Sequence, residues 1–157
     1  MNIKHVWSVL CRESVISQDD NNISIHGVFE QLAVSVAPQQ GHKEVPEKIS
    51  IPISYEIVSM WVKDHQKERY DGEIEYIFLD PKGKELLKTS QKIEIATNVK
   101  RHRTRMKISG MPLTISGDYI LKVSLRENGK KLSKPICELP LEVTIKKEAP
   151  KTNNLPN

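Results

Sequence analysis

The sequence predicts an all-β protein that folds as two packed antiparallel sheets of about eight strands. Its 17 isoleucines and 12 valines far outnumber its four alanines. β-Branched side chains lose rotamer freedom in helices and pack well on a pleated sheet, whereas alanine is the best helix former. Apolar residues also recur at every second position, the period of a strand, in segments separated by turn residues. A closed β-barrel is the alternative architecture.

Length and composition indicate a single domain. A chain of 157 residues can bury a core without disulfides, so we expect one domain over residues 1–147. Residues 148–157 hold two prolines and little to bury, which predicts a disordered tail. The net charge of +4 does not by itself require a nucleic-acid or membrane partner. No apolar segment reaches the roughly 7–15 residues of a signal peptide or the roughly 20 of a membrane span, so we expect a cytoplasmic protein.

The first half of the chain contains three long alternating segments. We expect a strand at residues 3–16, a polar turn at 18–22, and a second strand at 23–36 that completes a hairpin. The third segment, at 49–62, changes phase after Ile57, which predicts a β-bulge near Ile57–Val58. Pro52 has no backbone N–H, so we expect a sheet edge or a bulge at that position.

The second half predicts five more strands, near residues 74–78, 86–96, 99–109, 117–125 and 139–145. Asp80-Pro-Lys-Gly83 suits a β-turn, and Asn128-Gly129 is a strong hairpin signal. Five aromatic residues are the best candidates for the centre of the core: Trp7, Phe29, Tyr55, Tyr76 and Tyr119. Cys11 and Cys137 are expected to be free, buried thiols, although a bridge between them is conceivable.

Two segments resemble known β-sandwiches. Residues 108–119, with the Gly-x-Tyr sequence that ends at Tyr119, resemble the region that opens the last hairpin of immunoglobulin-like and C2-like domains. Together with residues 24–30, which follow the first strand, they are similar to an uncharacterised family of small bacterial β-sandwich proteins. The resemblance extends over most of residues 3 to 147. It implies the fold but no activity, cofactor or site residue.

The sharpest local feature is a basic segment at residues 100–107. On a strand, alternate cations project from one face about 7 Å apart, close to the phosphate spacing of a nucleic-acid strand. The candidate anion-binding residues are Lys100, Arg101, Arg103, Arg105 and Lys107. The competing interpretation is a solvated face, or an edge strand whose charge prevents aggregation. No aromatic residue lies among these cations to stack on bases.

Other patterns give no catalytic, cofactor or metal residue. His5 and His26 would meet if the first two strands paired along their length, but no histidine pair has metal-ligand spacing. Loop aspartates could bind calcium only if several converged, and turns use aspartate anyway. These aspartates are Asp19, Asp20, Asp64, Asp71, Asp80 and Asp118. No Gly-x-Ser-x-Gly elbow or glycine-rich phosphate loop occurs.

Three functions therefore compete. We expect a non-enzymatic module that binds a protein partner, whose identity and stoichiometry the sequence does not reveal. The alternative is a binder of nucleic acid or another polyanion that uses residues 100–107. A small hydrolase or sugar-binding protein is the weakest candidate, because aromatic residues make up only 5% of the chain.

Overall fold

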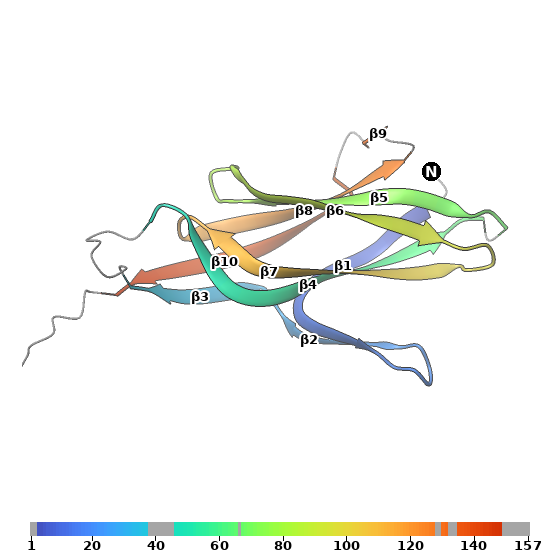
Figure 1. The fold of residues 1–157 in the computed structure, drawn as a ribbon, viewed down its shortest axis with the longest axis horizontal. Coiled ribbons are helices and arrows are strands. Elements are labelled where there is room, and N and C mark those ends of the chain that lie inside the picture. Colours follow the sequence, from blue (N-terminus) through green and yellow to red (C-terminus); the bar gives the residue numbers. More distant parts are fainter. Residues whose placement is uncertain (1–2, 38–45, 66, 128–129, 132–134, 149–157) are drawn as a thin grey trace, which may run out of the picture.

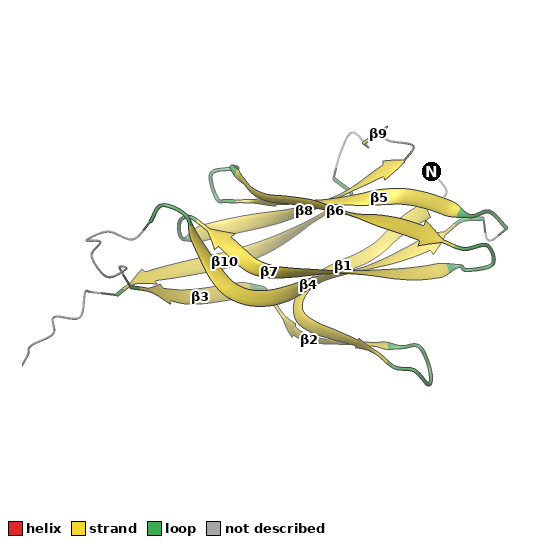
Figure 2. Cartoon of the chain, viewed as in Figure 1, coloured by secondary structure: helices red, strands yellow, loops and turns green. Residues whose placement is uncertain are grey.

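The computed structural model describes residues 3–37, 46–65, 67–127, 130–131 and 135–148. All regular structure in this part of the chain is β-strand (Figure 2). The strands divide into two sheets, of four and six strands, which pack face to face (Figure 1). The all-β prediction is confirmed, and the described strands form a two-sheet sandwich rather than one continuous ladder.

The four-stranded sheet has the order β2-β1-β4-β7, and every pair in it is antiparallel. Its strands are β1 (Ile3–Ile16), β2 (Ile23–Val28), β4 (Ile49–Lys63) and β7 (Arg101–Leu113). The predicted limits of the first strand are confirmed to the residue. β4 lies between β1 and β7, so it is the central strand of the face described below.

The six-stranded sheet has the order β3-β10-β8-β5-β6, and the short β9 pairs only with β8. Its strands are β3 (Gln31–Val36), β5 (Tyr70–Leu79), β6 (Glu85–Ile95), β8 (Gly117–Glu127), β9 (Lys130–Lys131) and β10 (Cys137–Lys147). β3 runs parallel to β10, whereas the other pairs are antiparallel. One pairing therefore departs from the expected antiparallel arrangement.

The prediction of a single strand at residues 23–36 is wrong. The segment is two strands, β2 and β3, which belong to different sheets. The chain crosses between the sheets at Phe29, whose buried ring packs in the core and whose N–H donates to the Leu10 carbonyl (2.8 Å). The apolar phase changes between Ile25 and Leu32, and this was the sequence signal of the break.

The predicted bulge near Ile57–Val58 is also wrong. Pairing between β4 and β7 is regular from Ser54 to Val62, and the irregularity lies between Ile51 and Ser54. This position contains Pro52, so the prediction of a bulge at that proline is confirmed. Apolar residues occupy both phases beyond Tyr55 because both faces of β4 are buried there, with Ile57 and Val58 fully enclosed.

The core between the sheets contains four of the five predicted aromatic residues: Phe29, Tyr55, Tyr76 and Tyr119. The prediction for Trp7 is wrong, because this side chain is only partly buried and lies outside the core cluster. Trp61 takes its place as the largest fully buried side chain, and its indole N–H donates to Thr104 Oγ1 (3.0 Å). Alternation alone does not say which face of a strand meets the second sheet.

A tyrosine fixes the connection between β7 and β8, where the chain passes from one sheet to the other. The Tyr119 hydroxyl accepts hydrogen bonds from the Thr114 and Ile115 N–H groups (2.8 and 3.1 Å) and donates to the Ile115 carbonyl (2.7 Å). This is the geometry of a tyrosine corner, in which a buried tyrosine binds the backbone a few residues upstream. The Gly-x-Tyr sequence thus has a local structural role.

The predicted turn at Asp80–Gly83 is confirmed by a hydrogen bond from the Gly83 N–H to the Asp80 carbonyl (2.8 Å). Residues 128–129 lie outside the described residues, although β8 and β9 pair on either side of them. The proposed tail also lies outside them, apart from Glu148. Both cysteines are free as expected; Cys11 is buried and Cys137 is partly buried.

Candidate functional site

The basic residues of β7 lie on the outer face of the four-stranded sheet, away from the core. Directly paired residues of an antiparallel ladder place their side chains on the same face. Arg101, Arg103, Arg105 and Lys107 pair with Val62, Met60, Val58 and Glu56 of β4, which pair in turn with Lys4, Trp7, Val9 and Cys11 of β1. These twelve residues form four rows across the sheet, which we call the outer face.

The β1–β2 hairpin folds over part of this outer face. β1 pairs with β4 only as far as Cys11 and then pairs with β2, and the hairpin lies below the four-stranded sheet in Figure 1. The buried Ser14 hydroxyl donates to Glu56 Oε2, which ties the hairpin to the centre of the face. Val58 and Cys11 are fully buried here, outside the core cluster between the sheets. The hairpin therefore covers a second, smaller buried region.

Two of the predicted anion-binding residues bind this hairpin directly, and a third binds the β4 glutamate that the hairpin contacts. Arg103 donates to the Asn21 carbonyl at the hairpin tip, and Arg105 donates to the Ser14 carbonyl (3.1 Å). Lys107 forms an ion pair with the buried Glu56 carboxylate (Nζ–Oε1 3.3 Å). Hydrogen bonds from charged donors are among the stronger ones in proteins. These three cations thus have intramolecular acceptors.

The other two candidates, Lys100 and Arg101, are exposed, and neither side chain makes an ion pair with another described residue. Lys100 precedes β7, and its carbonyl accepts a hydrogen bond from the Lys63 N–H (2.9 Å). The five candidates thus lie on β7 or directly before it, but three have acceptors within the described chain and two make no ion pair there. Two cations remain open at the end of the face that the hairpin tip does not reach.

An apolar patch lies beside these two cations. It consists of the partly buried side chains of Trp7, Val9, Met60 and Val62, none of which belongs to the main core cluster. Val6, the extra residue at an irregularity of β1 between His5 and Trp7, is 53% exposed. We call these five residues the Trp7 patch. Sequence analysis missed it because it assigned Trp7 to the core.

Sequence analysis also missed the cation Lys63. It is fully buried, and its ammonium group donates to the Ala96 carbonyl (2.7 Å) and to the Glu68 carbonyl. These two acceptors lie in the connections that follow β4 and β6. Lys63 therefore holds together two loops near the open end of the outer face, and its role is structural.

A hydrogen-bonded chain joins β1 to β4 on the core side of the same sheet. His5 Nε2 lies 2.7 Å from Ser8 Oγ, which lies 2.7 Å from the fully buried Ser59 Oγ. Burial lowers the pKa of His5, while a hydrogen bond with the Trp7 backbone opposes this shift. A neutral imidazole with an unprotonated Nε2 accepts a hydrogen bond from the Ser8 hydroxyl in this geometry, and the His5 ring also packs edge-on against Trp61 (5.2 Å). The chain satisfies polar groups at the margin of the core.

The expected meeting of His5 and His26 does not occur, because His5 pairs with Trp61 and His26 pairs with Glu13. Within the described part of the chain, no three His, Cys, Asp or Glu side chains gather in a way that could hold a metal ion. Several of the predicted loop aspartates have local partners instead, and two of them, Asp71 and Asp118, lie within β5 and β8 rather than in loops. For example, Asp20 Oδ1 accepts from the Asn22 N–H (3.0 Å), and Asp71 pairs with Arg69 (2.9 Å).

Comparison of the chain with models of known protein families and with curated proteins finds no match. Among the described residues, no helix has the length and apolar character needed to cross a lipid bilayer.

Proposed function

We propose that this protein is a non-enzymatic interaction module that binds an acidic segment of a partner protein at the Trp7 patch. The observation that carries the proposal is the juxtaposition of the patch with two open cations. Arg101 pairs with Val62 in one row of the outer face, and Lys100 is its chain neighbour. An occupant with an apolar side chain beside carboxylates would complement both features.

The residue types of the patch support a protein partner. Tryptophan, methionine and arginine are enriched at the centres of protein interfaces, and tryptophan and arginine dominate their binding energy. An indole that is partly buried in its own sheet is held in place before binding, so less rotamer entropy is lost on association. Trp7 meets this condition, because it lies between β1 neighbours and opposite Met60.

The hairpin contacts limit the area that a partner could use. Arg103, Arg105 and Lys107 already have acceptors within the chain. A partner that binds while these hairpin contacts are in place would therefore contact the rows of Lys4 and Trp7 rather than the whole basic strand. The contacts also weaken the polyanion alternative, because a nucleic acid would have to compete for three of the five cations.

Selection of a phage-displayed library of random peptides on the full chain tests the proposal. We expect the recovered peptides to combine aspartate or glutamate with a large apolar residue. Binding of a synthetic recovered peptide should change the fluorescence of Trp7, since the other tryptophan, Trp61, is fully buried. Trp7→Ala and Arg101→Glu should each weaken binding by about tenfold or more.

Two matched substitutions serve as controls. Val15→Ala shortens an exposed apolar side chain on the hairpin, and Lys92→Glu reverses an exposed charge on β6 of the other sheet. Both should leave peptide affinity unchanged, and the unfolding midpoints of all variants should be compared. Recovery of peptides without acidic residues, or equal affinities for Arg101→Glu and Lys92→Glu, would refute the proposal.

A further inference from the structure

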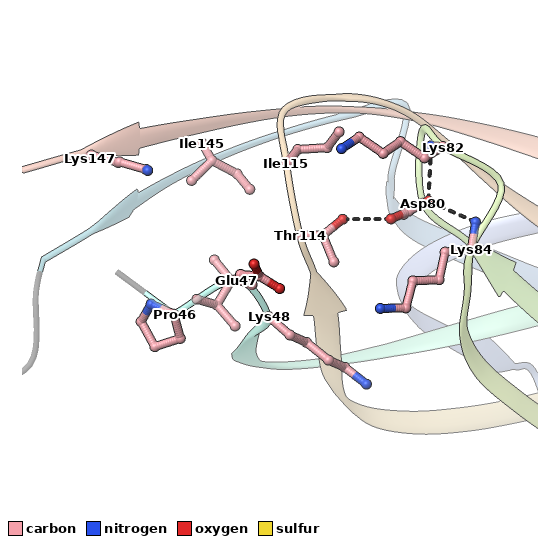
Figure 3. A pocket seen from close by; sticks show the side chains of 11 residues that line it. Pro46, Glu47, Lys48, Asp80, Lys82, Lys84, Thr114, Ile115, Ile145 and Lys147 are labelled. Atoms are coloured by element: carbon pink, nitrogen blue, oxygen red, sulfur yellow. Dashed lines mark hydrogen bonds between the residues drawn. The ribbon is translucent and has the colours of Figure 1, made fainter. Parts of the chain in front are cut away.

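A groove rich in lysine lies at one end of the sandwich, away from the Trp7 patch (Figure 3). The β5–β6 turn, the β7–β8 connection, the segment that leads into β4 and the end of β10 surround it. Its volume is about 490 Å³, within the range of small-molecule sites in proteins. The groove is therefore large enough for a small ligand.

The lining carries a net positive charge. Among the described residues, four lysines and two carboxylates line the groove, which gives these residues a formal charge of +4 − 2 = +2: Lys48, Lys82, Lys84 and Lys147 against Glu47 and Asp80. None of the four lysines forms an ion pair with another described residue. In Figure 3, Lys82 and Lys84 extend from the β5–β6 turn, and Glu47 and Lys48 lie across the space from them.

The carboxylate of Asp80 is committed to the fold. Oδ1 accepts hydrogen bonds from the backbone N–H groups of Lys82 and Lys84 (2.9 and 2.8 Å), and Oδ2 accepts one from the Thr114 hydroxyl (3.0 Å). Burial acts to raise the pKa of Asp80, but these hydrogen bonds and the charge of Lys84 outweigh it and lower the pKa. Asp80 thus holds the turn that presents two lysines, and its oxygens accept hydrogen bonds from the backbone of that turn and from Thr114 (Figure 3).

Isoleucines supply an apolar wall beside the charges. Ile49, Ile115 and Ile145 line the same groove, and Ile115 is 38% exposed. The backbone beneath them is fixed, because the Tyr119 hydroxyl binds Ile115 and the Ser116 hydroxyl accepts from the Ile145 N–H (2.8 Å). The groove therefore combines exposed cations with a positioned apolar surface, as expected of a site for an organic anion.

We propose that this groove binds a small organic polyanion, with two or more phosphate or carboxylate groups on a compact, partly apolar body. Lysine ammonium groups bind such anions as point charges, and a net lining charge of +2 favours a multivalent ligand over a monovalent one. The site is separate from the Trp7 patch, so it can be tested independently of the proposed function.

Titration of the ¹⁵N-labelled full chain with inorganic pyrophosphate and, separately, with citrate tests this site by NMR. The two anions distinguish phosphate from carboxylate ligands. We expect saturable shifts confined to amides of residues 47–49, 80, 82–84, 114–116 and 145–147. Lys82→Glu and Lys84→Glu should each lower affinity about tenfold or more, because each replaces a cation of the lining with an anion.

Lys92→Glu is the matched control, because it makes the same charge change at an exposed position outside the groove. It should leave the affinity within about twofold of the parent. Equal losses for Lys82→Glu and Lys92→Glu, or shifts that do not saturate, would overturn the site. So would an oligonucleotide that binds more tightly than pyrophosphate and shifts the amides of β7 instead.

Discussion

Two buried tyrosines of the core have hydroxyl groups in opposite situations. The Tyr119 hydroxyl makes three hydrogen bonds to the backbone of the β7–β8 connection. The Tyr76 hydroxyl lies near Ser59 and Thr104 but has no partner in hydrogen-bond geometry within the described structure, and burial raises the pKa of Tyr76 to about 12. The same side chain thus stabilises the fold at one position and leaves an unpaired polar atom at the other.

Removal of the two hydroxyls should therefore affect the free energy of unfolding differently. Tyr119→Phe leaves two backbone N–H groups and a carbonyl without a partner, so we expect the free energy of unfolding to fall by about 2–3 kcal/mol. Tyr76→Phe removes an unpaired group and should leave stability unchanged or raise it by about 1 kcal/mol. Urea unfolding of the two variants checks this, and a larger loss for Tyr76→Phe would contradict it.

Histidine burial predicts a loss of stability in acid. Burial lowers the pKa of His5, and burial together with the charge of Arg103 lowers the pKa of His102. As the pH falls through the ordinary histidine pKa of 6.5, the unfolded chain binds protons that these native histidines do not. The free energy of unfolding should be at its full value above this pH and should decline below it.

Urea unfolding over a series of pH values measures this decline. His5→Gln combined with His102→Gln should reduce the pH dependence, because the two native groups that resist protonation are removed. The exposed His65 provides the matched control, and His65→Gln should leave the profile unchanged. Identical profiles for the double variant and the parent would show that other groups cause the acid sensitivity.

At the scale of elements, β7 serves both faces of its sheet. His102, Thr104, Met106 and Ile108 alternate with the basic residues and point to the core side, where Thr104 accepts from Trp61. The basic residues on the other side contact the β1–β2 hairpin. The charged strand is therefore both an edge of its sheet and a support for a covering element.

Loss of these contacts should release the hairpin before the rest of the fold. We expect Arg103→Ala combined with Arg105→Ala to speed hydrogen exchange of the amides of residues 13–28 by about tenfold or more, since each charged hydrogen bond contributes about 1.5–3 kcal/mol. Amides of β5 and β8 should keep their exchange rates. Mass spectrometry of exchanged peptides resolves the two regions.

The control for this experiment is Lys100→Ala combined with Arg101→Ala, which removes the same number of charges from the same strand region. Neither residue contacts the hairpin through a hydrogen bond or ion pair that the structure describes. Exchange in residues 13–28 should remain at the parent rate. Faster exchange in this control would mean that net charge, rather than the individual contacts, holds the hairpin.

At the scale of the whole molecule, the two sheets present surfaces of different character. The four-stranded sheet carries the hairpin, the Trp7 patch and the open pair Lys100 and Arg101. The lysine groove lies where loops of both sheets meet, between β4, β10 and the β5–β6 turn. A nucleic-acid binder that uses only the basic residues 100–107 would need neither the Trp7 patch nor the lysine groove. The salt dependence of nucleic-acid binding therefore distinguishes this function from the proposed protein-binding module.

If nucleic acid contacts only the two open cations, Lys100 and Arg101, about two phosphates are neutralised. The logarithm of affinity should then fall with the logarithm of salt concentration at a slope of about −2, against about −4 to −5 for all five candidates. Fluorescence anisotropy of a labelled oligonucleotide at several salt concentrations measures the slope. A slope near −5, abolished by substitution of Arg101, Arg103 and Arg105, would favour the polyanion function over ours.

The sequence by itself determined the fold class and most strands. The excess of β-branched residues and the alternation at residues 3–16 depend on local packing preferences that hold wherever a strand lies in a sheet. The turn at Asp80–Gly83 and the irregularity at Pro52 were also predictable, since they follow from the backbone chemistry of the residues themselves. Four of the five basic positions, Arg101, Arg103, Arg105 and Lys107, likewise fell on one strand face, as a period of two requires, whereas Lys100 precedes the strand.

Only the tertiary structure decided which face of each strand is inside and which cations are free. Trp7 and Trp61 have similar local patterns, yet one lies on the outer face and the other in the core. Val58 is buried by a hairpin that begins more than forty residues earlier in the chain. Alternation reports that two faces differ, but burial depends on what covers each face, and that is a property of contacts between distant segments.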